Sequence, residues 1–292
     1  MKAKRKERLT CIDHTVTKEK FNLEWDDQFE MYITSPRPDE GELDKYYESE
    51  AYISHTDSKD SFIDKLYQAV KNYTIKEKVK LIEPFKLYDK SIVDIGCGTG
   101  DFIAACADHG WEVQGIEPNQ KARQLTVEKL QLKNNTKGEN IIYNEIQELV
   151  EANKRYDVIT MWHVLEHVYN LKEYIKQLKK LLNTNGTLII AVPNFNSFDA
   201  EHYKDHWAAY DVPRHLWHFS KKSIGFLFEK EGLKVSATLP MKFDAYYVSL
   251  LSEKYKTGRS NFIKAFYYGL ISNLKAKRTD EYSSLIYIIK QA

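Results

Sequence analysis

The stretch Ser91-Ile-Val-Asp-Ile-Gly-Cys-Gly-Thr-Gly100 decides how this chain folds. A run rich in β-branched residues, Ser91 to Ile95, leads directly into glycines at positions 96, 98 and 100, and a helical pattern follows from Phe102 to His109. Glycines at a strand-to-helix turn allow a sharp change of direction and leave no Cβ between the backbone and a ligand. The stretch therefore predicts a buried strand that ends at a ligand-binding turn.

An acidic residue follows at the spacing expected for a ribose contact. The next expected strand, Glu112 to Ile116, leads into Glu117 and Pro118, about 20 residues after the glycine turn. Because neighbouring parallel strands end at one edge of a sheet, the Glu117 carboxylate is placed to accept both hydroxyls of a ribose. The turn and the acid together predict an adenosine-containing ligand in the crevice above the sheet.

Two other nucleotide-binding motifs fit the glycine turn less well. In the dinucleotide fingerprint the last glycine comes one residue later, where this chain has Asp101, and a negative charge there opposes a pyrophosphate. A P-loop requires a Gly-Lys-Ser/Thr triplet, which does not follow the turn. An NAD-dependent oxidoreductase therefore remains only as an alternative.

From Ser91 to Ala237 the sequence alternates short β-branched runs with longer helical patterns. This alternation is typical of parallel strands joined by crossover helices, and it predicts a doubly wound α/β core. The expected strands are Ser91 to Ile95, Glu112 to Ile116, Ile141 to Tyr143, Tyr156 to Met161, Thr187 to Val192 and Leu233 to Ala237. The expected helices are Phe102 to His109, Gln120 to Leu130, Leu171 to Leu182 and Lys221 to Glu231.

The segments on either side of this core have other patterns. Residues 1–84 are expected to form an N-terminal cap or lid, with a helix from Ser61 to Phe85, and residues 85–292 the α/β domain. Two helical stretches within about 242–278 are expected to form an insertion that covers the substrate, before a final buried strand at 283–289.

Composition limits the classes of partner. The chain has 43 basic and 42 acidic residues, a formal net charge of +1, which argues against a general nucleic-acid or membrane-surface binder. Apolar runs such as Leu188 to Val192 are far shorter than a membrane span requires. The three cysteines form no Cys-x-x-Cys pair, and Thr10 to Lys20 is polar where an export signal needs an apolar stretch. A cytoplasmic protein with a small-molecule partner is expected.

Four segments in order resemble the class I S-adenosylmethionine-dependent methyltransferases. They are Val93 to Gly100, Gly115 to Pro118, Tyr156-Asp-Val-Ile-Thr-Met-Trp-His-Val-Leu-Glu-His-Val168, and Leu181 to Pro193. The segment Tyr210-Asp-Val-Pro-Arg-His-Leu-Trp-His-Phe-Ser220 is similar to one in the ubiquinone-methyltransferase-like subgroup. The resemblance implies a Rossmann-like seven-stranded sheet with its last strand antiparallel, S-adenosylmethionine as cofactor and a small-molecule methyl acceptor.

The resemblance also implies positions for the cofactor. The turn formed by Gly96, Cys97, Gly98, Thr99 and Gly100 would lie under its methionine part, with Asp94 just beneath. Glu117 and Pro118 would contact the ribose, and the adenine would lie near Glu145 to Glu148. The residues that would flank the sulfonium are Met161, Trp162 and His163.

Histidines cluster where the acceptor is expected. Methyl transfer needs the acceptor aligned with the sulfonium and, for most oxygen acceptors, a base that removes a proton. One cluster follows the fourth strand and the other follows the fifth, so both belong at the same edge of the sheet. The candidate catalytic residues are His163, His167, Arg214, His215 and His218, whereas His14, His109, His202 and His206 lack this placement.

A metal ion bound near the first histidine cluster is an alternative to a metal-free site. His163, Glu166 and His167, joined by His215 or His218, resemble the Glu-x-x-Glu-His segment and distal histidine of metal-dependent small-RNA and quinone-precursor methyltransferases, with His163 in place of the first glutamate. The same string also suits a helix start without an ion, and no metal is expected.

The N-terminal segment resembles the zinc module of some relatives less closely. Residues 9–38 are similar to the flanks of such a module, but only Cys11 remains, and Trp25 and Gln28 stand where a cysteine pair belongs. A zinc module is therefore not expected at this end of the chain.

The expected function is methyl transfer to a small molecule, most readily at oxygen. A non-catalytic S-adenosylmethionine-binding protein is the alternative from another class. The acceptor should be set by three segments in which the family motifs are weakest, Tyr46 to His55, Pro193 to His218 and Lys242 to Arg278. The first of these is either a lid over the cofactor or an aromatic packing surface.

Overall fold

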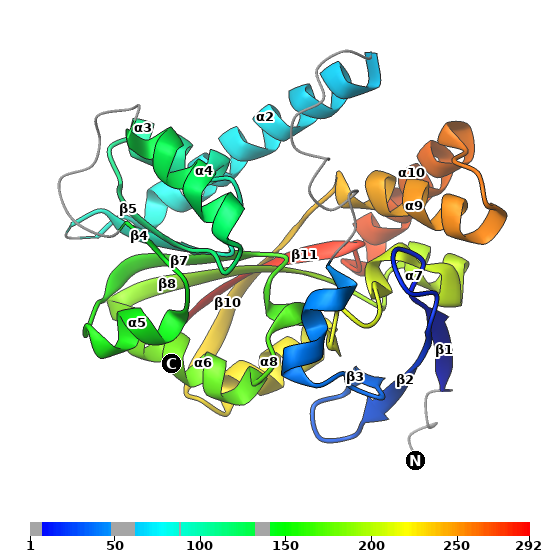
Figure 1. The fold of residues 1–292 in the computed structure, drawn as a ribbon, viewed down its shortest axis with the longest axis horizontal. Helices are drawn as coiled ribbons and strands as arrows, with labels where there is room; N and C mark the ends of the chain where they lie inside the picture. The colour runs from blue at the N-terminus through cyan, green and yellow to red at the C-terminus, as the bar shows by residue number, and fades with distance from the viewer. Residues whose placement is uncertain (1–7, 48–61, 88, 132–140) are drawn as a thin grey trace.

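The computed structural model describes residues 8–47, 62–87, 89–131 and 141–292, and its centre is a seven-stranded sheet (Figure 1). The strand order is β10-β11-β8-β7-β4-β5-β6. The strands are β4 (Ser91–Ile95), β5 (Glu112–Ile116), β6 (Ile142–Tyr143), β7 (Tyr156–Trp162), β8 (Leu182–Pro193), β10 (Leu233–Pro240) and β11 (Ser284–Gln291). Strands β8, β7, β4, β5 and β6 are parallel, and β11 is antiparallel to both β8 and β10. The expected doubly wound sheet with an antiparallel last strand is confirmed.

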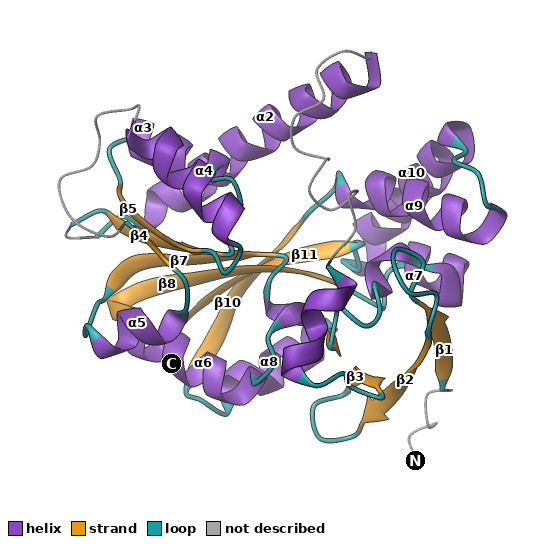
Figure 2. Ribbon diagram, viewed as in Figure 1, coloured by secondary structure: helices purple, strands orange, loops and turns teal. Residues whose placement is uncertain are grey.

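Helices cover both faces of this sheet (Figure 2). Strand residues alternate between the two layers, so that Ile92 packs on one side and Val93 on the other. One layer contains α2 (Phe62–Ile82), α3 (Asp101–Asp108) and α4 (Gln120–Gln131). The other layer contains α5 (Ile146–Glu151), α6 (Leu171–Leu181) and α8 (Lys221–Glu229). The carboxyl ends of the parallel strands are thereby left as the edge where a ligand can enter.

A second sheet, which the sequence analysis did not anticipate, is formed mainly by the N-terminal segment. Its order is β1-β2-β3-β9, with strands β1 (Leu9–Ile12), β2 (Lys20–Asp26), β3 (Met31–Ser35) and β9 (Trp217–His218). Strand β9 comes from the segment after β8, and Tyr32 pairs with His218. Phe21 and Leu23 pack against the segment that holds α7 (Phe198–Tyr203). This sheet therefore joins the two regions on either side of residue 84.

Several boundaries differ from the expected ones. Strand β8 begins at Leu182 rather than Thr187, because Leu182 already pairs with Tyr156 of β7. Helix α5 was not expected; it is closed by a capping box between Glu145 and Glu148. In the stretch expected as a lid or packing surface, Tyr46 and Tyr47 are described, whereas residues 48–55 lie outside the described residues.

The insertion between β10 and β11 consists of two helices, as expected. They are α9 (Asp244–Thr257) and α10 (Phe262–Thr279), and they pack on each other. Figure 1 shows this pair projecting at one end of the molecule beyond β11. Across the part of the chain that the structure describes, no helix combines the length and apolar character needed to cross a membrane.

Candidate active site

The glycine turn lies between β4 and α3 and has a left-handed backbone at all three glycines. The φ angles of Gly96, Gly98 and Gly100 are +72°, +56° and +79°, a conformation that other residues adopt at a cost. A Cβ added to Gly96 or Gly100 would lie 2.5 Å from a neighbouring side chain, but at Gly98 it would meet no described atom within 4 Å. Gly98 therefore borders open space, as a turn that cradles a ligand requires.

Glu117 lies directly across this turn. One carboxylate oxygen accepts the Gly98 N–H at 2.9 Å, and the other accepts the Asn119 N–H at 2.9 Å. The Arg123 guanidinium donates to the carbonyls of Glu117 and Pro118 at 2.7 and 2.8 Å and holds the end of β5 in place. Glu117 is therefore in direct contact with the glycine turn, next to which the sequence predicted it to lie.

Asp94 and Cys97 lie beneath the turn. The Asp94 carboxylate is buried and accepts a hydrogen bond from the Thr160 hydroxyl at 2.6 Å. Burial raises the pKa of Asp94 to about 7, although Thr160 and the nearby Lys78 act in the opposite direction. Burial also raises the pKa of the Cys97 thiol, which keeps it neutral, and the Thr99 carbonyl accepts a hydrogen bond from Lys129. These groups support the turn from inside the protein.

The end of β7 carries Met161 and Trp162 to the same edge of the sheet. Met161 is fully buried, and the Trp162 Nε1 is buried without a hydrogen-bond partner among the described residues. The Lys78 ammonium lies 4.2 Å from the centre of the Trp162 ring. Lys78 comes from α2, outside every motif, and carries no signal of this role in the sequence. S-adenosylmethionine has an adenosine at one end and a carboxylate at the other. The site fits this molecule, because it combines an open glycine turn, an acid placed for a ribose, a lysine and an indole N–H without a partner among the described residues.

His163 follows Trp162 with a left-handed backbone, φ +58°. Its Nε2 lies 2.9 Å from Asp244 Oδ2, and its Nδ1 lies 3.4 Å from Glu166 Oε1. Burial opposes protonation of this ring, but the two carboxylates outweigh it and raise the pKa of His163 to about 10. His163 is therefore an imidazolium at neutral pH. Asp244, the first residue of α9, was not expected at the site.

The two expected clusters meet next to His163. The rings of His167 and His215 are 4.5 Å apart, and His215 Nε2 lies 4.0 Å from Glu166 Oε1. His167 Nδ1 lies 3.1 Å from the Arg214 carbonyl and 2.9 Å from the Tyr47 hydroxyl. Burial and His215 lower the pKa of His167 to about 4, so this ring is neutral. The convergence of the two loops agrees with the sequence-based expectation.

Glu166, His167 and His215 also have the geometry of a possible metal site. One ligand atom from each lies within 4.8 Å of the others. Glu166 is 1% exposed, and neither of its carboxylate oxygens has a hydrogen-bond partner in the described ranges. The nearest compensating charge is His163, which lowers the pKa of Glu166 despite its burial. The carboxylate can therefore be neutralised by His163 or by an ion.

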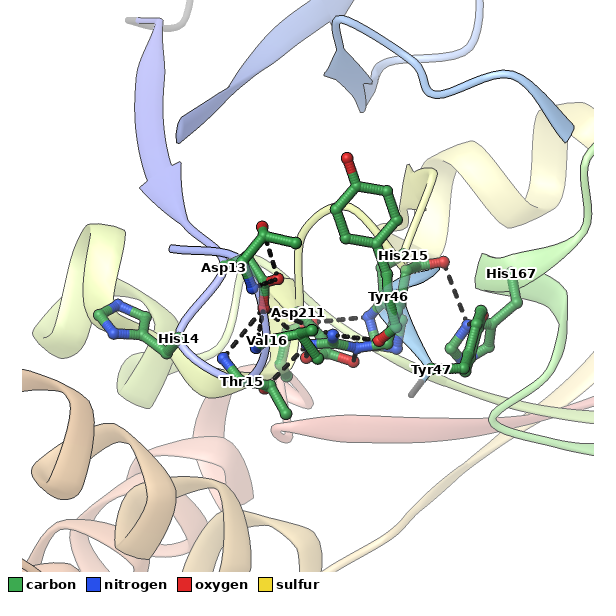
Figure 3. A network of polar contacts seen from close by, with 12 residues as sticks. Asp13, His14, Thr15, Val16, Tyr46, Tyr47, His167, Asp211 and His215 are labelled. Carbon is green, nitrogen blue, oxygen red and sulfur yellow. Dashed lines mark hydrogen bonds and ion pairs between the residues drawn. The ribbon is translucent and has the colours of Figure 1, made fainter. Parts of the chain in front are cut away.

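The other two candidates for catalysis face the N-terminal sheet. Arg214 is buried; its guanidinium donates to Asp211, to the Tyr46 carbonyl and to the Thr15 hydroxyl, and is ion-paired with Asp13. Figure 3 shows Asp13, Thr15, Tyr46 and Asp211, which surround this guanidinium. His218 is buried in β9, with Nε2 2.9 Å from the Thr34 hydroxyl. Both side chains therefore have protein partners away from the cluster around Glu166.

Two of the histidines that were not expected at the site pack against tyrosine rings. His14 stacks on Tyr255 and His202 stacks on Tyr268. The Glu148 carboxylate accepts the backbone N–H groups of Asn144 and Glu145, so it closes α5. An adenine site near Glu145 to Glu148 stays a prediction.

Comparisons with known proteins show the family of the chain. A family model described as a methyltransferase domain matches residues 67–238, more than half of the chain. The chain is 32% identical over 120 residues to a ubiquinone biosynthesis O-methyltransferase of Serratia proteamaculans, covering 38% of this chain and 46% of the relative. It is 34% identical over 103 residues to the protein of the same name from Rickettsia akari, covering 35% and 40%. The chain thus spans less than half the length of these relatives.

A likeness to solved structures supports the fold. The magnesium protoporphyrin IX methyltransferase of Synechocystis PCC 6803, solved with S-adenosylhomocysteine, superposes with a TM-score of 0.53 at 16% identity, covering 82% of this chain and 91% of that chain. Coclaurine N-methyltransferase superposes with a TM-score of 0.52 at 15% identity, covering 81% and 75%.

Proposed function

The chain belongs to the methyltransferase-domain family, and from that premise we propose that it transfers the methyl group of S-adenosylmethionine to an oxygen of a small molecule. The observation that carries the proposal is the Glu117 carboxylate bonded across the Gly98 turn, at the same sheet edge as the histidine cluster. The relatives reported above are named O-methyltransferases, which favours oxygen over nitrogen or carbon. Family membership also disfavours the NAD-dependent alternative.

The cofactor supplies an activated methyl group, and the chain supplies its binding site. Glu117 accepts the ribose hydroxyls, and the backbone of the Gly96–Gly100 turn lies against the methionine part. Burial lowers the pKa of Lys78, and a methionine carboxylate bound near this turn would favour its charged form. Trp162 forms the wall beside the sulfonium, where its N–H, which has no partner among the described residues, remains available for a polar contact. Met161, next to it in β7, is fully buried in the core.

The acceptor is proposed to lie over the histidine cluster. His163 holds its proton at neutral pH and therefore cannot accept another one. Neutral His167 is the base candidate, with His215 beside it, and the Tyr47 hydroxyl 2.9 Å from His167 Nδ1 helps to orient the ring. His163 instead balances the negative charge of Glu166, because its two ring nitrogens face Glu166 and Asp244.

The remaining parts of the proposal concern partner and location. We propose a small-molecule acceptor without a nucleic-acid partner, in keeping with the charge balance of the chain. Cys11, Cys97 and Cys106 are free and buried, which suits a reducing compartment such as the cytoplasm.

Calorimetric titration with S-adenosylhomocysteine tests the cofactor site. Glu117→Gln should weaken binding about 10- to 100-fold, because a hydrogen bond from a ribose hydroxyl to a charged acceptor is lost. Glu112→Gln, an exposed acid at the start of the same strand, is the matched control and should bind as the unaltered protein does. Equal affinity for all three proteins would contradict the site.

Radiolabelled S-adenosylmethionine then tests turnover. The label should move to phenolic or catecholic acceptors and not to matched amines, and His167→Gln should lower the rate by about 100-fold or more. Tight binding without transfer to any member of a broad acceptor panel would favour the non-catalytic alternative.

A further inference from the structure

Helix α10 presents an apolar face to solvent. Its large exposed side chains recur at helical spacing, and Ile263 is 85% and Phe266 62% exposed. The full set is Phe262, Ile263, Phe266, Tyr267, Leu270 and Leu274. A helix on a soluble protein normally turns such residues inward and exposes polar ones. A contiguous apolar face of this kind marks an interaction surface.

The opposite face of α10 explains why these residues point outward. The buried positions are small and follow one another by four, three and four residues: Ala265, Gly269, Ser272 and Ala276. A Cβ added to Gly269 would lie 2.7 Å from the Tyr246 ring, so the close approach of α9 and α10 depends on this small-residue face. Phe266, which is still 62% exposed, stacks on Tyr246 at 5.3 Å and lies at the border of the two faces. Rotating the helix to bury Ile263 or Phe266 would place large side chains in that contact. The outward apolar face is therefore built into the packing.

The charged residues within the segment that carries this face all have the same sign. The segment from Lys254 to Thr279 contains no acidic residue, and all its basic residues are exposed: Lys254, Lys256, Arg259, Lys264, Lys275, Lys277 and Arg278. The chain as a whole is nearly neutral, with 43 basic and 42 acidic residues. The positive charge is thus concentrated on the helical insertion that carries the apolar face.

We propose that α10 docks this protein onto the surface of an anionic lipid bilayer. Large apolar side chains among basic ones are the features of a helix that lies in the membrane interface, with the apolar face among the acyl chains and Lys and Arg at the headgroups. The charge argues against a second copy of the chain as the occupant, because two such faces would bring their basic residues together. The helix lies on the bilayer and does not cross it, in keeping with the absence of a spanning helix among the described residues.

The docked helix is connected to the active site through α9. Helix α9 packs along α10, and its first residue, Asp244, contacts His163. Docking would hold the insertion at the bilayer surface, so an apolar acceptor held in the membrane could enter beside the histidine cluster. The apolar and basic surface of α10 does not depend on the proposed methyl transfer, and vesicle binding is measured without an activity assay.

Vesicle sedimentation with the full chain tests the proposal. Vesicles of phosphatidylcholine with about 30% phosphatidylglycerol should bind the protein, vesicles of pure phosphatidylcholine should bind it much less, and added salt should weaken binding. The double variant Lys264→Glu/Lys277→Glu should lower partitioning at least tenfold, given about fivefold for each basic side chain near an anionic surface. Ile263→Ser/Phe266→Ser should lower it at least tenfold as well, because apolar area no longer enters the acyl region.

A matched control is Lys121→Glu/Leu125→Ser on α4, where both residues are also exposed. It should bind vesicles as the unaltered protein does, and every variant should keep the unaltered melting temperature. Equal partitioning of all variants, or no binding to anionic vesicles, would overturn the proposal. It would also be overturned by a concentration-dependent dimer in sedimentation velocity that Ile263→Ser/Phe266→Ser abolishes, without vesicle binding, because the face would then be an interface between copies.

Discussion

His163 Nε2 lies 2.9 Å from Asp244 Oδ2, which links the loop after β7 to the first residue of the helical insertion. The contact controls the charge of the active site, since Asp244 and Glu166 keep His163 protonated. It also ties the position of α9 to the place where the acceptor is expected.

Asp244→Asn should lower the pKa of His163 from about 10 toward its ordinary value. The substitution removes the negative charge that contributes most to the raised pKa, while burial still favours the neutral ring. NMR titration of the His163 ring measures the change. Asp280→Asn, an exposed acid at the end of α10, should leave the titration unaltered. An unchanged pKa in Asp244→Asn would show that this contact does not hold the proton.

Stability should fall as the pH rises from about 6.5 to about 10. The folded protein keeps the His163 proton up to a pKa of about 10, whereas the unfolded chain releases it near 6.5. The His163 proton therefore contributes fully to the free energy of unfolding below pH 6.5, and this contribution is lost as the pH rises through 10. Urea unfolding across this range should show a larger decline for the unaltered protein than for His163→Gln. Parallel declines would assign the pH dependence to other groups.

Arg214→Ala should destabilise the fold by about 3 to 5 kcal/mol, because it leaves Asp13 and Asp211 unpaired in a buried network. Arg8→Ala breaks an exposed pair with Glu24 and should cost no more than about 1 kcal/mol. Thermal and urea unfolding measure both. Where Arg214→Ala remains folded, its affinity for S-adenosylhomocysteine should be unaltered. A raised KM for the acceptor with unchanged stability would instead place Arg214 in acceptor binding.

Prolonged chelation should leave both cofactor binding and methyl transfer unchanged, because His163 already balances the charge of Glu166. Elemental analysis of the purified protein should find much less than one ion per chain. A stoichiometric ion that is removed together with activity would assign Glu166, His167 and His215 as its ligands, since their ligand atoms already lie within 4.8 Å. His218 would not join them, because its Nε2 contacts Thr34.

Local patterns allowed much of the cofactor site to be predicted from the sequence. The strand, the glycines and Glu117 lie within one short segment, and Gly98 and Glu117 are in direct contact. The meeting of His167 with His215 was also predictable, because parallel strands end at a shared edge. Arg214 belongs to the same sequence cluster as His215, yet its side chain turns toward Asp13, a residue with no recognisable signal in the sequence.

The sequence by itself determined the parallel sheet, the glycine turn and the edge at which the histidines gather, because these follow from periodicity and from the order of neighbouring segments. Only the tertiary structure decided the second sheet, in which Tyr32 of β3 pairs with His218 of β9. It also decided that His163 is charged, since Asp244 comes from a distant segment. The direction of the large apolar residues of α10 depends on the close approach at Gly269. Charge state and exposure depend on which distant groups surround a side chain, and a local pattern does not contain that information.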